Sequence, residues 1–93
     1  ATGLSNRWRM PPLSELPGTL SRDKFLRALH RMGFLIDVSG GDGSHVMVNW
    51  PPTNKSVTIP HRMIPKQALK YLLKEIEPVT LGRVTWEKIK EEL

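Results

Sequence analysis

Residues 40–60 read Gly-Gly-Asp-Gly-Ser-His-Val-Met-Val-Asn-Trp-Pro-Pro-Thr-Asn-Lys-Ser-Val-Thr-Ile-Pro, and this stretch decides the fold. A glycine-rich turn precedes a strand at 46–50, and a polar turn leads to a second strand at 56–59. On the first strand the apolar side chains are those of Val46, Val48 and Trp50, so His45 falls on the opposite face. The pattern predicts a hairpin with one buried face and a histidine at the start of its first strand.

The segment before this hairpin predicts a helix followed by a strand. Ser21 is a suitable N-cap, and Gly33 is the expected end of the helix. Between them apolar residues recur at helical spacing, namely Phe25, Leu26, Leu29 and Met32. The basic residues of this helix fall mostly on its other side, namely Arg22, Lys24, Arg27 and Arg31. Residues 34–38 then form a strand whose expected inward side chains are Phe34, Ile36 and Val38.

The segment after the hairpin predicts two further helices. The first begins near Lys66, buries Leu69, Leu72, Leu73 and Ile76, and ends at Pro78. The second has Thr85 as its N-cap and docks through Trp86, Ile89 and Leu93. Together the elements predict an α+β fold of α-β-β-β-α order, with a three-stranded antiparallel sheet covered by helices on one side and a short C-terminal helix. We expect a flexible tail at 1–18, the folded unit at 19–77 and an extension at 78–93.

Composition narrows the classes of function. The 93 residues suit one small domain, and no apolar run is long enough to span a membrane. The absence of a signal-like N-terminal segment makes a soluble cytoplasmic protein the default expectation. The chain has no cysteine, which excludes disulfides, thiolate metal sites and cysteine nucleophiles. Its 14 Lys and Arg against 9 Asp and Glu give a net charge of +5, which suits a polyanion such as nucleic acid.

Among the three histidines His45 is the strongest candidate for function. Imidazole is the side chain best suited to move protons near neutral pH, and the preceding glycines allow a ligand to approach the backbone closely. His30 is most simply a surface residue of the first helix, whereas His61 could touch a phosphate. A serine-hydrolase pair of Ser44 and His45 fails, because neighbours on a strand point to opposite faces. No closely spaced ligand motif predicts a metal site.

Four segments in order resemble the HicA-type toxins of toxin–antitoxin systems. They are Leu-His-Arg-Met-Gly-Phe at 29–34, Gly-Ser-His at 43–45, Val-Thr-Ile-Pro-His at 57–61, and residues 66–73. The resemblance covers about residues 19–77. It implies a fold like that of double-stranded-RNA-binding domains, cleavage of messenger RNA without a metal or other cofactor, and an antitoxin of the HicB type that covers the active site. It also places the family's essential histidine on His45.

Two positions depart from the family's pattern. The family commonly has one residue between the strand-ending proline and the next histidine, whereas His61 follows Pro60 directly. The second helix of the family usually opens with a Gly-Thr-Leu-like step, whereas this chain has Lys-Gln-Ala-Leu at 66–69. These departures bear on activity more than on the fold.

The sequence thus supports a metal-independent ribonuclease in which His45 transfers protons and the ribose 2′-hydroxyl is the nucleophile. The residues expected to bind RNA are Gly43, Ser44, Arg62, Lys66 and Lys70. A second interpretation is a module of the same fold that binds RNA without cutting it. A third treats the open sheet face, which includes Met47, as a surface for binding protein only.

Overall fold

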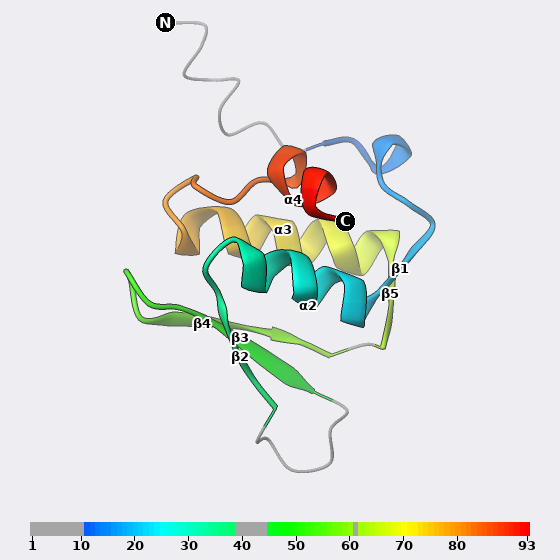
Figure 1. Ribbon diagram of the computed structural model, residues 1–93. Helices are drawn as coiled ribbons and strands as arrows, with labels where there is room; N and C mark the ends of the chain where they lie inside the picture. The colour runs from blue at the N-terminus through cyan, green and yellow to red at the C-terminus, as the bar shows by residue number, and fades with distance from the viewer. Residues whose placement is uncertain (1–10, 39–44, 61) are drawn as a thin grey trace, which may run out of the picture.

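The computed structural model describes residues 11–38, 45–60 and 62–93. Its centre is an antiparallel sheet of order β2-β3-β4, made of β2 (Leu35–Asp37), β3 (Val46–Trp50) and β4 (Lys55–Ile59). Two helices, α2 (Arg22–Arg31) and α3 (Lys66–Val79), cover one face of this sheet (Figure 1). The predicted α+β fold of α-β-β-β-α order is confirmed.

The pairing of β3 with β4 places the apolar side chains on the helix side, as the alternation predicts. Val46, Val48 and Trp50 are buried, and so are Val57 and Ile59 on β4. The uncovered face carries the polar and exposed positions, and these are Leu35, Asp37, Met47, Asn49, Ser56 and Thr58. The prediction that Val38 points inward is wrong. Pairing of β2 ends at Asp37, so the alternation stops there, and Val38 is 64% exposed.

Helix α2 ends in a Schellman motif built around Gly33. The Gly33 amide donates to the carbonyl of His30 at 3.1 Å, and the Phe34 amide donates to that of Leu29 at 3.0 Å. Gly33 has φ of +115°, which explains why a glycine is needed at the turn. The turn delivers Phe34 into the core, where its ring centroid lies 4.9 Å from that of Trp50. The predicted helix end is confirmed.

Helices α2 and α4 (Trp86–Glu92) begin where the sequence predicts, but the predicted capping hydrogen bonds do not form. Ser21 and Thr85 occupy N-cap positions, but neither side chain makes a capping hydrogen bond. The Arg22 amide instead donates to the carbonyl of Arg62, at 2.8 Å. A backbone carbonyl from elsewhere in the chain therefore satisfies a donor at the start of α2.

Helix α3 continues to Val79 and does not end at Pro78. A second Schellman motif closes it, in which the Gly82 amide donates to the carbonyl of Glu77 at 2.8 Å and Leu81 has φ of +55°. The buried hydroxyl of Thr80 donates to the carbonyl of Ile76 at 3.0 Å and accepts the Val84 amide at 3.1 Å. This side chain links the end of α3 to the segment that follows.

Two short strands, which the sequence analysis does not predict, form a separate ribbon. Strand β1 (Thr19–Ser21) pairs antiparallel with β5 (Met63–Pro65), with Leu20 opposite Ile64. Each strand leads directly into a helix, β1 into α2 and β5 into α3. The ribbon therefore ties the starts of the two central helices together.

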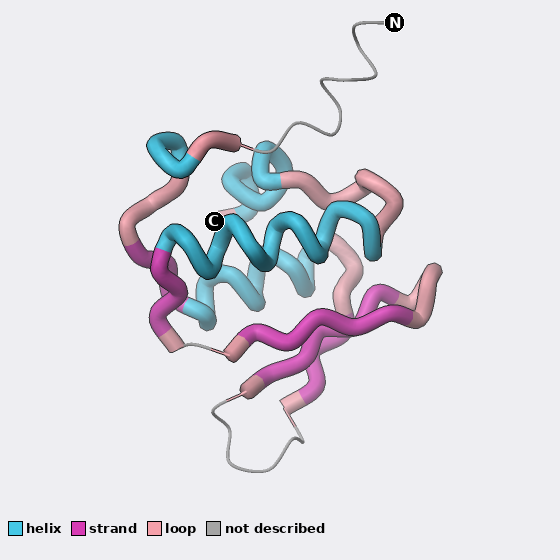
Figure 2. The backbone as a smooth tube through the Cα atoms, turned by 180° about the vertical axis from the view of Figure 1, so that it is seen from behind, coloured by secondary structure: helices cyan, strands magenta, loops and turns pink. Residues whose placement is uncertain are grey.

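The flanking segments form a third layer on the side of the helices away from the sheet (Figure 2). A 3-10 turn, η1 (Leu13–Glu15), leads to Leu16, which is 4% exposed. Residues 13–18 thus belong to the body and not to a tail. Helix α4 (Trp86–Glu92) buries Trp86 and Ile89. The predicted docking of Leu93 is wrong, because it follows the last helical residue and is 46% exposed.

Candidate functional site

His45 lies immediately before β3 and is exposed, on the face of the sheet that no helix covers. The register gives its surroundings. Val46 pairs with Ile59, so His45 lies at the end of the sheet where β4 finishes. Met47, which shares the face with His45, is 43% exposed and pairs with Thr58 and Asp37. His45 is therefore at the surface of the part of the chain that the structure describes.

Arg62 lies at the same end of the sheet, three residues after the last residue of β4. It is exposed, and its carbonyl accepts the amide of Arg22. Arg22, Asp23 and Arg62 line a pocket of about 230 Å³. The exposed guanidinium group of Arg62 can bind phosphate oxygens with paired N–H donors, whereas Arg22 is only 8% exposed. The pocket has a net positive lining beside the end of the sheet that carries His45.

The sequence prediction for Arg22 is wrong. This residue was expected on the solvent side of the helix, but it is only 8% exposed. Arg22 begins α2 directly after β1, and its amide binds the carbonyl of Arg62, the residue before β5. Hydrophobic spacing within one helix gives no information about a ribbon formed by distant residues. The only feature of the sequence that singled out Arg22 was its position directly after the N-cap residue Ser21.

The structure does not describe every residue that the sequence assigned to the site. Gly43 and Ser44, expected to contact RNA, lie outside the described residues, as do His61 and the glycines at 40 and 41. Their roles therefore remain predictions.

Lys66 and Lys70 lie on α3, and both are half-buried. Lys66 is the first residue of the helix, and its amide donates to the carbonyl of Gly18 at 3.1 Å. Ala68 and Leu72 line a groove against Thr58 and Pro60, on the β4 side of α3. Lys70 is two residues from each and therefore lies roughly 200° around the helix from them. The two lysines thus point to the flank of α3 away from β4, although Lys66 is close to Arg62 along the chain.

The described residues also bear on metal sites and on membrane-spanning segments. No three His, Asp or Glu side chains of residues 11–38, 45–60 and 62–93 come together as metal ligands would. In the same part of the chain, no helix has the length and apolar character needed to cross a membrane.

The comparisons with known proteins address the central part of the chain. The family model for the HicA toxin of bacterial toxin–antitoxin systems matches residues 22–77, more than half of the chain. No curated protein and no solved structure matches. The matched range runs from the first residue of α2 almost to the end of α3, and it includes His45 and Arg62. The chain therefore belongs to the HicA toxin family of bacterial toxin–antitoxin systems.

Proposed function

We propose that this toxin is an endoribonuclease that cleaves messenger RNA, with His45 as the proton-transfer group, and that an antitoxin of the HicB type neutralises it. The observation that carries the proposal is the position of His45. It is an exposed histidine at the open end of the central strand, within the part of the chain that the HicA family model matches. Membership of a toxin–antitoxin family supports the part of the proposal that concerns an antitoxin.

The chemistry needs only groups that RNA and a histidine supply. The ribose 2′-hydroxyl attacks the adjacent phosphorus, so a 2′-oxygen–phosphorus bond forms and the bond from phosphorus to the 5′-oxygen breaks. A neutral His45 can accept the proton of the 2′-hydroxyl, and the imidazolium can give a proton to the departing 5′-oxygen. The products are a 2′,3′-cyclic phosphate and a 5′-hydroxyl. Proton transfer by one positioned group typically contributes a factor of ~10² to 10⁴ in rate.

Charge also develops on the phosphate during this step, and we propose that Arg62 stabilises it. The carbonyl of Arg62 accepts the amide of Arg22, and this hydrogen bond holds the backbone of Arg62 close to the end of β4. A cation near the reacting phosphate stabilises the charge that develops in the transition state. Arg62 is therefore the second residue on which we expect activity to depend.

The uncovered sheet face supports the assignment of a protein partner. Leu35 is 57% and Met47 43% exposed, and both lie on the face that carries His45. Exposed apolar side chains among polar neighbours are typical of surfaces that bind protein. A partner seated on this face would block access of RNA to His45, which is how an antitoxin could inhibit the enzyme.

The test is incubation of the purified protein with a long RNA, with and without a chelator, beside His45→Ala and Asn49→Ala. Asn49 lies on the same face of the same strand and serves as the matched control, with circular dichroism to verify the fold of each variant. We expect chelator-resistant cleavage that His45→Ala abolishes and Asn49→Ala retains, with cyclic phosphate ends. Intact RNA with wild-type protein, together with a shifted band on a native gel, would refute the enzyme in favour of a non-cleaving RNA-binding module.

A further inference from the structure

The exposed face of α2 carries a concentration of positive charge that the proposed site does not use. Its exposed residues are Asp23, Lys24, Arg27, His30 and Arg31, so a single acid faces three permanent cations and an imidazole. We call the set of Lys24, Arg27, His30 and Arg31 the α2 basic face. At spacings of three and four residues these side chains are neighbours on one side of the helix.

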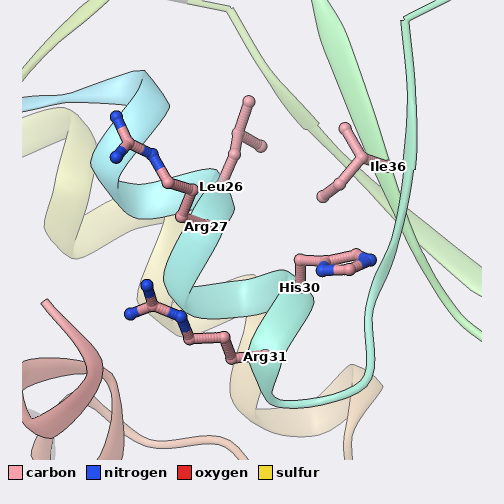
Figure 3. Close-up of a pocket in the computed structure, with 5 residues that line it drawn as sticks. All are labelled: Leu26, Arg27, His30, Arg31 and Ile36. Atoms are coloured by element: carbon pink, nitrogen blue, oxygen red, sulfur yellow. The ribbon is translucent and has the colours of Figure 1, made fainter.

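Figure 3 shows three of the four residues of this face, Arg27, His30 and Arg31. Arg27 and Arg31 extend on the side of the helix away from Ile36, whereas the ring of His30 is directed toward the strand side. Together with Leu26 they border a hollow of about 230 Å³. Arg27, His30 and Arg31 therefore lie at the rim of a hollow between α2 and β2, and the two guanidinium groups point outward from it.

The charges of this face are largely available to a ligand. Among the described residues, neither Lys24 nor Arg27 forms an ion pair, and the ion pair that we find there joins Lys90 to Glu87 on α4. Arg31 uses one N–H to bind the carbonyl of Glu92, at 2.8 Å. Cations that are not neutralised by carboxylates maintain a positive potential outside the protein, which attracts polyanions.

The composition of the face favours a nucleic acid over an acidic protein. The large exposed hydrophobic side chains belong to other elements, and these are Leu35, Val38, Met47, Met63, Tyr71, Leu81 and Leu93. None of them lies on α2. Protein interfaces have an apolar and aromatic centre, whereas interfaces with nucleic acid are polar and strongly positive. The α2 basic face has the second character.

The face also leads to the proposed site. Helix α2 begins at Arg22, whose amide binds Arg62 at the end of the sheet that carries His45. From Lys24 to Arg31 the helix rises by roughly 10 Å. At the rise of about 3.4 Å per nucleotide that one strand of double-stranded DNA has, this length corresponds to about three nucleotides.

From these observations we propose that the α2 basic face binds the phosphate backbone of the RNA strand on which His45 acts. The proposal rests on the proposed function for the identity of the substrate. It replaces Lys66 and Lys70 as the principal contacts to the backbone, because both are half-buried on another helix. Arg27 and Lys24 supply the charge, and Arg31 contributes the guanidinium atoms that do not bind Glu92.

The experiment compares two double variants in a His45→Ala background, in which RNA is not cut. Lys24→Gln with Arg27→Gln removes two charges from the α2 basic face. Lys55→Gln with Arg83→Gln is the matched control, because it removes one lysine and one arginine that are both exposed and lie outside α2, and Lys55 begins β4 at the end of the strand away from Ile59. Thr53 bonds the carbonyl of Val79 there, at 2.9 Å, which places the end of α3 beside the hairpin turn. Thermal denaturation verifies that both variants fold.

Binding of a fluorescein-labelled single-stranded RNA is then measured by anisotropy over a range of salt concentrations. Each lost phosphate contact lowers the slope of log K against log[salt] by about 0.7 for single strands, so we expect a decrease of about 1.4 in the α2 variant and none in the control. Equal slopes in the two double variants would overturn the inference. Polyglutamate serves as the probe for an acidic protein. An α2 variant that loses affinity for polyglutamate but retains its affinity for RNA would also overturn the inference, because the face would then bind an acidic protein.

The two proposals fail in different ways. If the wild type cleaves RNA but the α2 variant keeps the salt slope of the control, the α2 face is not the binding surface and the enzyme assignment stands. If the wild type does not cleave RNA but the slopes differ as expected, the α2 face stands as the RNA-binding surface of a protein that is not a ribonuclease.

Discussion

Replacement of Gly33 by alanine tests the junction between α2 and the sheet with one added methyl group. The glycine has φ of +115°, a conformation that residues with a side chain rarely adopt. A Cβ atom at this position would lie 3.2 Å from Cζ3 and 3.6 Å from Cη2 of Trp50. Trp50 in turn packs on Phe34, so its ring can give way only by disturbing the core.

The expected cost follows from these contributions. A left-handed backbone costs a residue with a side chain about 1–2 kcal/mol, and the close contact with Trp50 adds to this figure. Alanine also restricts the unfolded chain, which offsets roughly 0.4–1 kcal/mol. The two backbone contributions leave a loss of about 0–1.6 kcal/mol. With the close contact to Trp50 added, we expect a net loss of about 1–2 kcal/mol for Gly33→Ala. For a domain of this size it corresponds to a decrease in Tm of roughly 4–16 °C.

The assay is thermal and urea denaturation followed by circular dichroism, with Gly18→Ala as the control. A Cβ atom on Gly18 meets nothing within 4 Å, so this variant should be neutral or more stable by up to about 1 kcal/mol. If Gly33→Ala matched Gly18→Ala in stability, the strained turn and the contact with Trp50 would both be refuted as constraints on the fold.

Three further variants test the end of α3. Leu81→Asn should be neutral or stabilising by up to about 1 kcal/mol, because Leu81 already has φ of +55° and asparagine tolerates that conformation better than leucine. A lower free energy of unfolding in urea denaturation would contradict this prediction. Thr80→Val should cost roughly 1–3 kcal/mol in the same assay, since it leaves the buried Val84 amide without its acceptor. Burial raises the pKa of the Glu77 carboxyl, so the folded state binds this proton more tightly than the unfolded state, and stability decreases as pH rises from about 4.5 through the folded pKa. Glu77→Gln should remove that decrease. If the unfolding free energies of the wild type and of Glu77→Gln varied with pH in the same way, a contribution of Glu77 to the pH dependence would be refuted.

Much of the fold follows from local patterns. The alternation in β3 and β4, the helical spacing in α2 and α3, and the glycine after α2 each specify an element within a few residues. The ribbon of β1 and β5 does not, because strands of three residues are too short to show a period and their pairing joins distant segments. Val38 was misplaced for a related reason, since alternation gives the face of a residue but not the point at which pairing ends.

The candidate site was predictable in part. The exposure of His45 follows from the same alternation that buries Val46 and Val48. The association of Arg22 with Arg62 could not be predicted, because it depends on a backbone amide and a backbone carbonyl, groups that every residue of this type carries. Spacing identified the lysines of α3 but not how far the rest of the fold would cover Lys66 and Lys70.

The third layer makes the stable unit larger than the part of the chain that defines the family. The core cluster found among the described residues has eighteen members, of which Leu16, Leu20, Val84, Trp86 and Ile89 lie outside residues 22–77. A fragment cut to that range would lose these five side chains and would expose the surfaces that they cover. A protease that cleaved within either flank would expose these surfaces without approaching His45, so the stability of the fold depends on segments outside the range that the family model matches.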